Sequence, residues 1–317
     1  MSKHLVLVVG VGRSGTSLFA GISGTLGFRI PQPEVTADDT NPKGFGEPQW
    51  VVDFHSKLMR RKRVTVFDAR PTAWEHTAAL SAEPEIQQEL TAWLKGELAG
   101  GENVVVVKDP RIGWFLPLWN AAAERAGVPP AFVTMLRHPA QILTSAKKSY
   151  GTWQTDASRA AAWINVMLET ERATRGTRRA YVAYPDLLED WAAQLRRIGA
   201  PLGIDALTAI DRAAHPEVDA FVDPSLFRNR TGWEGLDVPQ RVVDLAERVW
   251  ALFADPEANT VAFDAARAEY DALYGEAEAI SHSSVIAVRP RKQRGAATGS
   301  APLSVRVKRR LKRALKG

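Results

Sequence analysis

The sequence predicts an α/β fold in which a parallel sheet is flanked by helices. Residues 5–9 (LVLVV) form a continuous apolar run that leads directly into a glycine-rich loop. Other short apolar runs, such as VVVV at 104–107 and FVTML at 132–136, recur along the chain with helix-length segments between them. This alternation is typical of a parallel sheet with helices on both faces.

The individual elements follow in chain order. Strands are expected at 5–9, 64–67, 104–107, 132–136 and 180–183, because these runs are short and rich in β-branched residues. The first helix is expected at 16–26, where Leu18, Ile22 and Leu26 recur at helical spacing. Further helices are expected at 48–61, 83–99, 114–126, 139–150, 157–175, 185–198 and 238–254.

Charge divides the chain into a body and a tail. Residues 283–317 hold eleven of the 41 Lys and Arg residues and no acid, which leaves 30 basic against 36 acidic residues before them. The pI of 9.5 therefore reflects the tail, and nucleic acid is not expected as a partner.

Composition also sets the expected domain boundaries. Residues 295–302 (GAATGSAP) are small, and apolar residues then recur at helical spacing among basic ones. We expect one domain at 1–280, a flexible linker at 281–302 and a basic amphipathic tail at 303–317. The tail either docks on an anionic membrane surface or stays a solvated extension.

Several classes of site are not expected. The chain has no cysteine, and its six histidines form no pair with zinc-ligand spacing, so a metal-independent chemistry is favoured. The first apolar run is too short to span a membrane and lacks a signal-peptide cleavage site, which predicts a cytoplasmic protein.

The loop after the first strand, GVGRSGTS, is almost a Walker A loop. Gly10 and Gly15 have the required spacing, but Thr16 stands where the lysine would be. Backbone N–H groups at the start of a helix still bind an anion without that lysine. The loop therefore predicts a P-loop-like fold and a phosphoanhydride ligand other than ATP, with Arg13 as a candidate cation.

GRSGTS resembles the 5′-phosphosulfate loop of sulfotransferases, which use 3′-phosphoadenosine 5′-phosphosulfate (PAPS). The resemblance implies that PAPS is the co-substrate and that Arg13 and the loop amides stabilise charge on the departing phosphate oxygen. The donor-binding residues implied are Gly12, Arg13, Ser14, Gly15, Thr16 and Ser17.

Three further segments extend the resemblance over about residues 5–190. In LRHPAQILTS, Arg137 and Ser145 have the spacing with which sulfotransferases hold the 3′-phosphate. NPKGFGE, from Asn41, and YPDLL, from Tyr184, are similar to segments of bacterial members. The first of these implies that Glu47 is the general base, acting on a hydroxyl acceptor of a carbohydrate or glycolipid; an amine acceptor stays open.

Other residues compete for these roles. His55 is an alternative base, His138 is expected to shape a turn, and KDPR places Lys108, Asp109 and Arg111 at a strand end where ligands bind. Arg228 and Arg230 are candidates for a third contact to the 3′-phosphate. Trp50, Trp74, Trp114, Trp119 and Trp153 are candidates for stacking on adenine or on a sugar acceptor, while most of the ten tryptophans are expected in the core.

Two other functions remain open. Asp109 has the position of a Walker B aspartate, which favours an ATP-dependent kinase. A noncatalytic nucleotide-binding module, tethered by its basic tail, is the third hypothesis.

Overall fold

The computed structural model describes residues 2–38, 41–150, 154–223 and 232–287. It divides into two compact units, Met1–Ala272 and Leu273–Gly317. The first unit holds the sheet and the pocket. In the second, the described residues continue a helix that ends at Ala287. The tail expected at 303–317, and most of the linker expected before it, lie outside the described residues.

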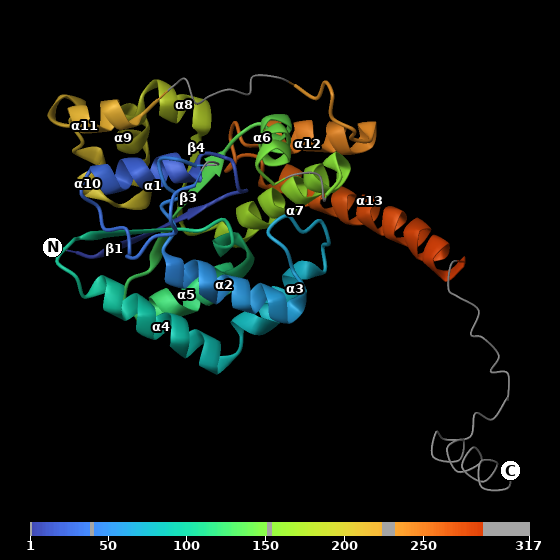
Figure 1. Cartoon of the computed structure of the whole chain (residues 1–317), viewed down its shortest axis with the longest axis horizontal. Helices are drawn as coiled ribbons and strands as arrows, with labels where there is room; N and C mark the ends of the chain where they lie inside the picture. Colours follow the sequence, from blue (N-terminus) through green and yellow to red (C-terminus); the bar gives the residue numbers. More distant parts are fainter. Residues whose placement is uncertain (1, 39–40, 151–153, 224–231, 288–317) are drawn as a thin grey trace, which may run out of the picture. The chain divides into compact units, whose positions relative to one another are not determined.

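A four-stranded parallel sheet forms the centre of the first unit (Figure 1). The strands are β1 (His4–Val9), β2 (Val104–Lys108), β3 (Pro130–Leu136) and β4 (Arg178–Ala183), in the order β2-β1-β3-β4. Val8 pairs with Lys108, and Leu136 pairs with Ala183, so the carboxyl ends of the strands meet along one edge. The predicted α/β fold class is confirmed.

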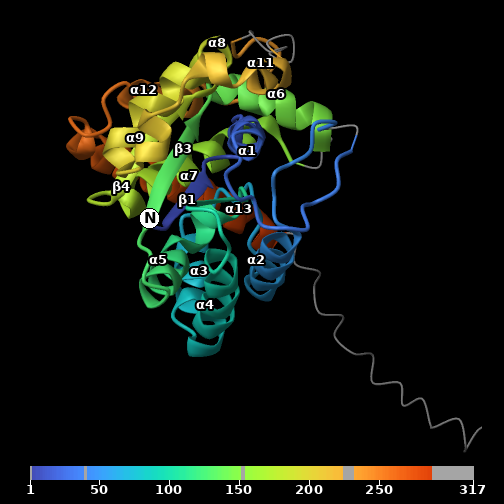
Figure 2. The same cartoon turned by 90° about the vertical axis from the view of Figure 1, so that its left-hand side faces the viewer.

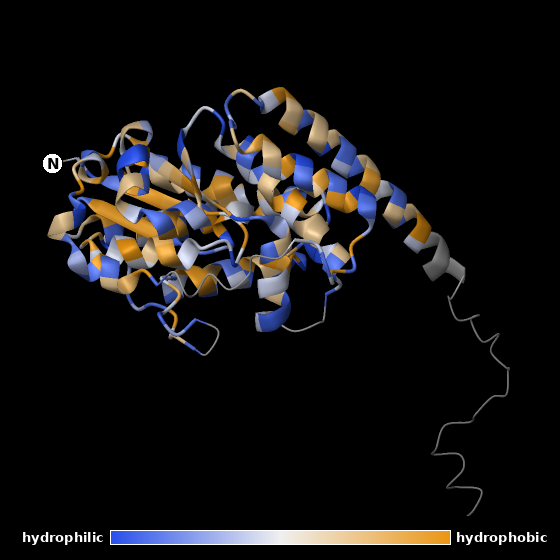
Figure 3. Ribbon diagram, turned by 90° about the horizontal axis from the view of Figure 1, so that it is seen from above, coloured by the Kyte–Doolittle hydropathy of each residue, from blue (hydrophilic) through white to orange (hydrophobic). Residues whose placement is uncertain are grey.

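Helices cover both faces of this sheet (Figure 2). On one face, α1 (Thr16–Thr25), α8 (Tyr184–Glu189) and α9 (Trp191–Leu202) pack on alternate strand residues such as Val6 and Val133. The other side of the sheet carries α3 (Ala73–Ser81), α4 (Pro84–Leu98) and α5 (Leu116–Arg125). The strands are the most continuously hydrophobic ribbons in Figure 3, as expected for a sheet that is buried on both faces.

The described residues contain nine further elements. They are α2 (Gln49–Lys62), η1 (Ile112–Phe115), α6 (Pro139–Tyr150), α7 (Asp156–Thr174), α10 (Asp205–Thr208), η2 (Arg212–Ala214), α11 (Pro216–Phe221), α12 (Gln240–Leu252) and α13 (Thr260–Ala287). No helix in the described part of the chain has both the length and the apolar character needed to cross a membrane.

Three expectations about elements were wrong. Residues 64–67 form a loop: Val64 and Phe67 are buried, as in a strand, but the segment pairs with none of the four described strands. The single helix expected at 185–198 is two helices, since Asp190 ends α8 and its side chain caps α9 by accepting from the Ala193 N–H at 3.0 Å. The helices α3 and α13 were not expected.

The helix α13 also bears on the boundary expected at residue 280. It is rich in Ala and Glu, which are strong helix formers, and it continues to Ala287. Residues 281–287 are therefore helical, although we assigned them to a flexible linker.

Candidate active site

Residues at the carboxyl end of each of the four strands line one candidate active site. The glycine-rich loop follows β1, Lys108 is the last residue of β2, Arg137 follows β3, and Tyr184 follows β4. Ligands of open α/β sheets bind at this edge, close to the point where the strand order reverses. Here that point is β1, which lies between β2 and β3.

The loop after β1 depends on two glycines in the left-handed region. Gly10 has φ 122°, and a Cβ there would lie 2.8 Å from the carbonyl oxygen of Met135. Gly15 has φ 95°, and a Cβ there would lie 2.2 Å from the ring of Tyr184. Arg13 has φ 74°, a conformation that costs a non-glycine residue energy and that is typical of functional loops.

The helix α1 begins immediately after this loop, at Thr16. The N–H groups of Thr16 and Ser17 have no intrahelical acceptor because they belong to its first turn. They lie at the positive end of the helix dipole and are therefore suited to an anion. The N–H of Ser14 is instead used inside the loop, where it donates to the Val11 carbonyl at 3.2 Å.

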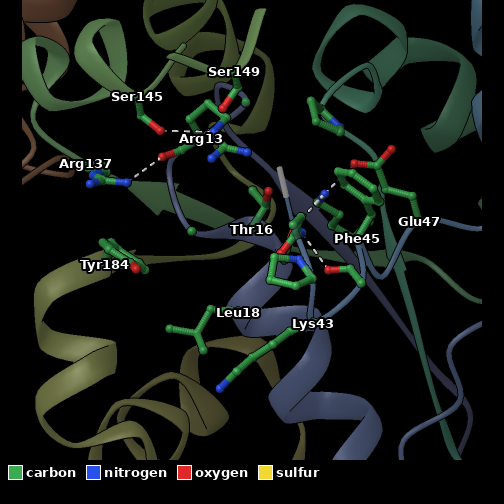
Figure 4. A pocket seen from close by; sticks show the side chains of 18 of the residues that line it. Arg13, Thr16, Leu18, Lys43, Phe45, Glu47, Arg137, Ser145, Ser149 and Tyr184 are labelled. Carbon is green, nitrogen blue, oxygen red and sulfur yellow. Dashed lines mark hydrogen bonds and ion pairs between the residues drawn. The ribbon is translucent and has the colours of Figure 1, made fainter. Parts of the chain in front are cut away.

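These elements surround a cavity of about 490 Å³. Figure 4 shows Arg13, Arg137, Ser145 and Ser149 gathered at one end, with Glu47 and Phe45 on another side. The lining residues are Gly12, Arg13, Gly15, Thr16, Ser17, Leu18, Asn41, Pro42, Lys43, Gly44, Phe45, Glu47, Lys108, Pro110, Arg137, Ser145, Lys148, Ser149, Tyr184, Leu188, Phe221 and Asp223.

Positive charge dominates this lining. Its basic residues are Arg13, Lys43, Lys108, Arg137 and Lys148, and its acidic residues are Glu47 and Asp223. A cavity with this excess attracts a ligand that carries several negative charges, such as a nucleotide with more than one phosphate.

The first loop and the segment after β3 meet directly in the cavity. Arg13 Nε donates to Ser145 Oγ at 3.0 Å, and Arg137 Nη1 donates to the backbone oxygen of Arg13 at 3.0 Å (Figure 4). The guanidinium of Arg137 also lies 4.7 Å from the centre of the Tyr184 ring. Apart from Ser14, the residues expected to bind the two ends of a donor therefore line a single cavity.

Glu47 is buried beside Lys108. Lys108 Nζ donates to Glu47 Oε1 at 2.5 Å and to Ser17 Oγ at 3.1 Å, so it links the carboxylate to the first turn of α1. Burial raises the pKa of Glu47 and lowers the pKa of Lys108, while the attraction between the two charges opposes both changes. A carboxylate whose pKa is raised holds a proton more readily than an exposed one, which suits a general base.

A buried chain of hydrogen bonds lies behind this pair. His55 Nδ1 and Asp109 Oδ2 are 2.7 Å apart, Trp119 Nε1 donates to His55 Nε2 at 3.1 Å, and Arg111 Nη1 donates to Asp109 Oδ1 at 2.7 Å. Arg111 Nη1 also lies 3.8 Å from Glu47 Oε2. Burial alone would raise the pKa of Asp109, but the hydrogen bond from His55 and the charge of Arg111 outweigh it and hold that pKa below its usual range.

This arrangement bears on two sequence candidates. His55 is completely buried and bonded at both ring nitrogens, so it has no free nitrogen for a substrate proton. Asp109 is also completely buried and bonded to His55 and Arg111, so its carboxylate does not face the cavity as a Walker B aspartate would. Lys108 and Pro110 of the KDPR segment are among the described residues that line the cavity, whereas Asp109 and Arg111 are not.

The remaining candidates lie elsewhere. The Ser14 hydroxyl is buried beneath the loop, close to Gly10, and has no partner among the described residues. His138 pairs with Glu247 at 3.0 Å and is not part of the described lining. Arg228, Arg230 and Trp153 lie outside the described residues.

None of the candidate tryptophans in the described residues lines the cavity, in line with the expectation that most tryptophans are in the core. Trp114 and Trp119 are buried in the core, Trp74 stacks on Trp114, and Trp50 stacks between Phe54 and Trp93. The described lining instead contains Phe45, Tyr184 and Phe221. Phe45 and Tyr184 lie in segments that the sequence analysis had singled out, but no signal had marked Phe221.

Neither the scan of family models nor the search of curated proteins gives a match. Among solved structures, the sulfotransferase domain of the olefin synthase from Synechococcus PCC 7002 is 18% identical, with a TM-score of 0.40, over 78% of this chain and 95% of that chain. Sulfotransferase STF1 from Mycobacterium tuberculosis H37Rv is 15% identical, with a TM-score of 0.35, over 70% of this chain and 77% of that chain.

Proposed function

We propose that this protein is a sulfotransferase that moves a sulfuryl group from PAPS to a hydroxyl group. One observation carries the proposal: a single cavity joins the anion-binding loop, the Arg137–Ser145 pair and the buried Glu47–Lys108 pair. A donor with phosphates at two positions can contact both of the first two groups, and the third offers a base and a cation for the transfer.

Arg137 and Ser145 would hold the 3′-phosphate. A guanidinium binds a phosphate through two N–H groups, and a hydroxyl adds a short directional donor. Lys148 and Ser149 line the same cavity one helical turn further along α6. Leu18, Tyr184, Leu188 and Phe221 offer the apolar contacts that an adenine ring requires.

Glu47 would take the proton of the acceptor hydroxyl. The acceptor oxygen forms a bond to sulfur as the bond from sulfur to the 5′-phosphate oxygen breaks, so the sulfuryl group leaves on the acceptor and the 5′-phosphate of the departing adenosine 3′,5′-bisphosphate gains one negative charge. The N–H groups of Thr16 and Ser17, together with Arg13 and Lys108, would stabilise that charge. These side chains and amides complete the step without a metal ion.

The acceptor would be a carbohydrate or glycolipid hydroxyl. Asn41 and Lys43 line the cavity from the loop that carries Glu47, and they can hydrogen-bond the other oxygens of a sugar. An amine acceptor, which this base can also deprotonate, is the alternative. The protein would act in the cytoplasm, with its basic tail docking on an anionic membrane surface.

Calorimetry with adenosine 3′,5′-bisphosphate, AMP and ATP with magnesium tests the donor site. We expect the bisphosphate to bind at least about tenfold more tightly than AMP, and Arg137→Ala to abolish this preference. Arg60→Ala removes an equal charge from an exposed position on α2 and should change nothing. Tighter binding of ATP with magnesium would support a kinase instead.

Transfer is tested with labelled PAPS and a panel of sugar, glycolipid, phenol and amine acceptors. We expect label to move to a hydroxyl acceptor, and Glu47→Gln to reduce turnover by about 100-fold or more while bisphosphate affinity is kept. Bisphosphate binding without any Glu47-dependent release of label from PAPS would support the noncatalytic module.

A further inference from the structure

Behind Glu47, hydrogen bonds link Trp119, His55, Asp109 and Arg111 into a buried chain that takes no direct part in the proposed reaction. It joins four elements, since Trp119 lies on α5, His55 lies on α2, Asp109 follows β2, and Glu47 lies in the loop before α2. His55, Asp109 and Trp119 are completely buried. A buried polar chain of this kind is costly unless every group has a partner, so its geometry is strongly determined.

The hydrogen bonds determine the protonation state of His55. An indole N–H can only donate, so His55 Nε2 accepts from Trp119 and carries no proton. The imidazole proton is therefore on Nδ1, which donates to Asp109 Oδ2 at 2.7 Å. The ring also stacks on Phe115 at 5.1 Å, which fixes its plane. His55 is thus a neutral and oriented donor to one oxygen of Asp109.

The other oxygen of Asp109 holds Arg111. It accepts from Arg111 Nη1 at 2.7 Å and from the Arg111 backbone N–H at 3.0 Å. In this position the guanidinium remains 3.8 Å from Glu47 Oε2, beyond hydrogen-bond distance. Glu47 is therefore hydrogen-bonded to one cation, Lys108, while a second cation, Arg111, lies nearby without a hydrogen bond to it.

This restraint matters for a base. If Arg111 moved onto Glu47, the carboxylate would be hydrogen-bonded by two cations, and its affinity for a proton would fall. The charged groups that face Glu47 are Lys108 and Arg111, which favour its ionised form, and Asp109, which disfavours it. Asp109 thus acts on Glu47 both directly and by holding Arg111.

We propose that Asp109 is a positioning residue that holds Arg111 away from Glu47 and so keeps Glu47 basic enough to accept the acceptor's proton. His55 and Trp119 orient Asp109 for this task. The inference rests on the proposed function for its catalytic meaning. The electrostatic effect on Glu47, however, can be measured without any reaction.

The experiment is a carbon-13 NMR titration of protein labelled at the glutamate carboxyl carbons, with the Glu47 signal assigned by its loss in Glu47→Gln. In Asp109→Asn we expect the Glu47 titration to move to lower pH by about one pH unit or more, because Arg111 is released towards it. In Arg111→Ala we expect it to move to higher pH. An unchanged titration in Asp109→Asn would overturn the proposal.

A double variant separates positioning from simple charge. In an Arg111→Ala background, Asp109→Asn should shift the Glu47 titration less than it does in the wild type, because the guanidinium that Asp109→Asn would release is absent. Equal effects in both backgrounds would mean that Asp109 acts on Glu47 by its charge alone, and the positioning role would be wrong. Arg111 has 22% of its side chain exposed, so Arg111→Ala should still fold.

His55 offers a conservative rescue. Asn can place an N–H where His55 has its Nδ1. In His55→Asn, Glu47 should therefore titrate at the same pH as in the wild type. In His55→Ala, the Glu47 titration should move to lower pH, as it does in Asp109→Asn. Identical behaviour of the two variants would overturn the role of His55. If these NMR shifts occur but no variant, nor the wild type, transfers label from PAPS, the positioning stands and the proposed function fails.

Discussion

Lys108 and Glu47 form a buried ion pair, with 2.5 Å between Nζ and Oε1. Their side chains are only 2% and 10% exposed. Since removing one partner of such a pair leaves a buried charge without compensation, the pair should show strong energetic coupling.

The first prediction concerns stability. Glu47→Gln and Lys108→Met should each lower the free energy of unfolding by about 3 kcal/mol. The double variant Glu47→Gln/Lys108→Met should lower it by much less than the sum of the two single losses. Chemical denaturation of the four proteins measures this coupling. As a control, Lys57→Met breaks the exposed Lys57–Glu89 pair and should cost less than about 1 kcal/mol. Additive losses at Glu47 and Lys108 would mean that the pair is not coupled in solution.

The second prediction concerns pH. Burial raises the pKa of Glu47 above its ordinary value of 4.5, and a base must be deprotonated to act. As the pH falls, Glu47 should become protonated, and turnover should be lost, at a higher pH than if the base were an exposed glutamate. Lys108→Met removes a charge that lowers this pKa, so the loss should begin at a still higher pH. The measurement is kcat/KM against pH, with Lys57→Met as the control. If the acidic side of the kcat/KM profile moves to lower pH in Lys108→Met, Glu47 is not the base that this profile reports.

Part of this site is predictable from the sequence. The apolar run of β1, the glycines after it and the spacing of Arg137 and Ser145 locate three segments at strand ends. The resemblance places these segments around one donor, but the direct contact between Arg13 and Ser145 is not predictable, because they are 132 residues apart and the contact depends on the neighbouring positions of β1 and β3. Lys108 was expected at a ligand-binding strand end, but its pairing with Glu47 was not, because Glu47 comes from a loop without periodicity.

The third prediction concerns the 3′-phosphate. Ser145→Ala removes the hydroxyl that meets Arg13 Nε, and a hydrogen bond to a charged group typically contributes about 1.5–3 kcal/mol. Affinity for adenosine 3′,5′-bisphosphate should fall by about tenfold or more, whereas affinity for AMP should be unchanged. Thr144→Ala, which removes a hydroxyl bonded to the Ala140 carbonyl on the same helix, is the matched control. An equal loss for both ligands would place Ser145 away from the 3′-phosphate.

The fourth prediction compares two glycines, Gly15 and Gly27, that both have positive φ, at 95° and 82°. Alanine at either position should cost about 1–2 kcal/mol of stability through the backbone. At Gly15 the new Cβ would also lie 2.2 Å from the Tyr184 ring, which contacts Arg137, whereas at Gly27 it would meet nothing within 4 Å. Calorimetry should therefore show weaker bisphosphate binding in Gly15→Ala but not in Gly27→Ala. If the displaced ring is the cause, Gly15→Ala should not weaken binding further in a Tyr184→Ala background; a further loss there would show that the loop itself has changed.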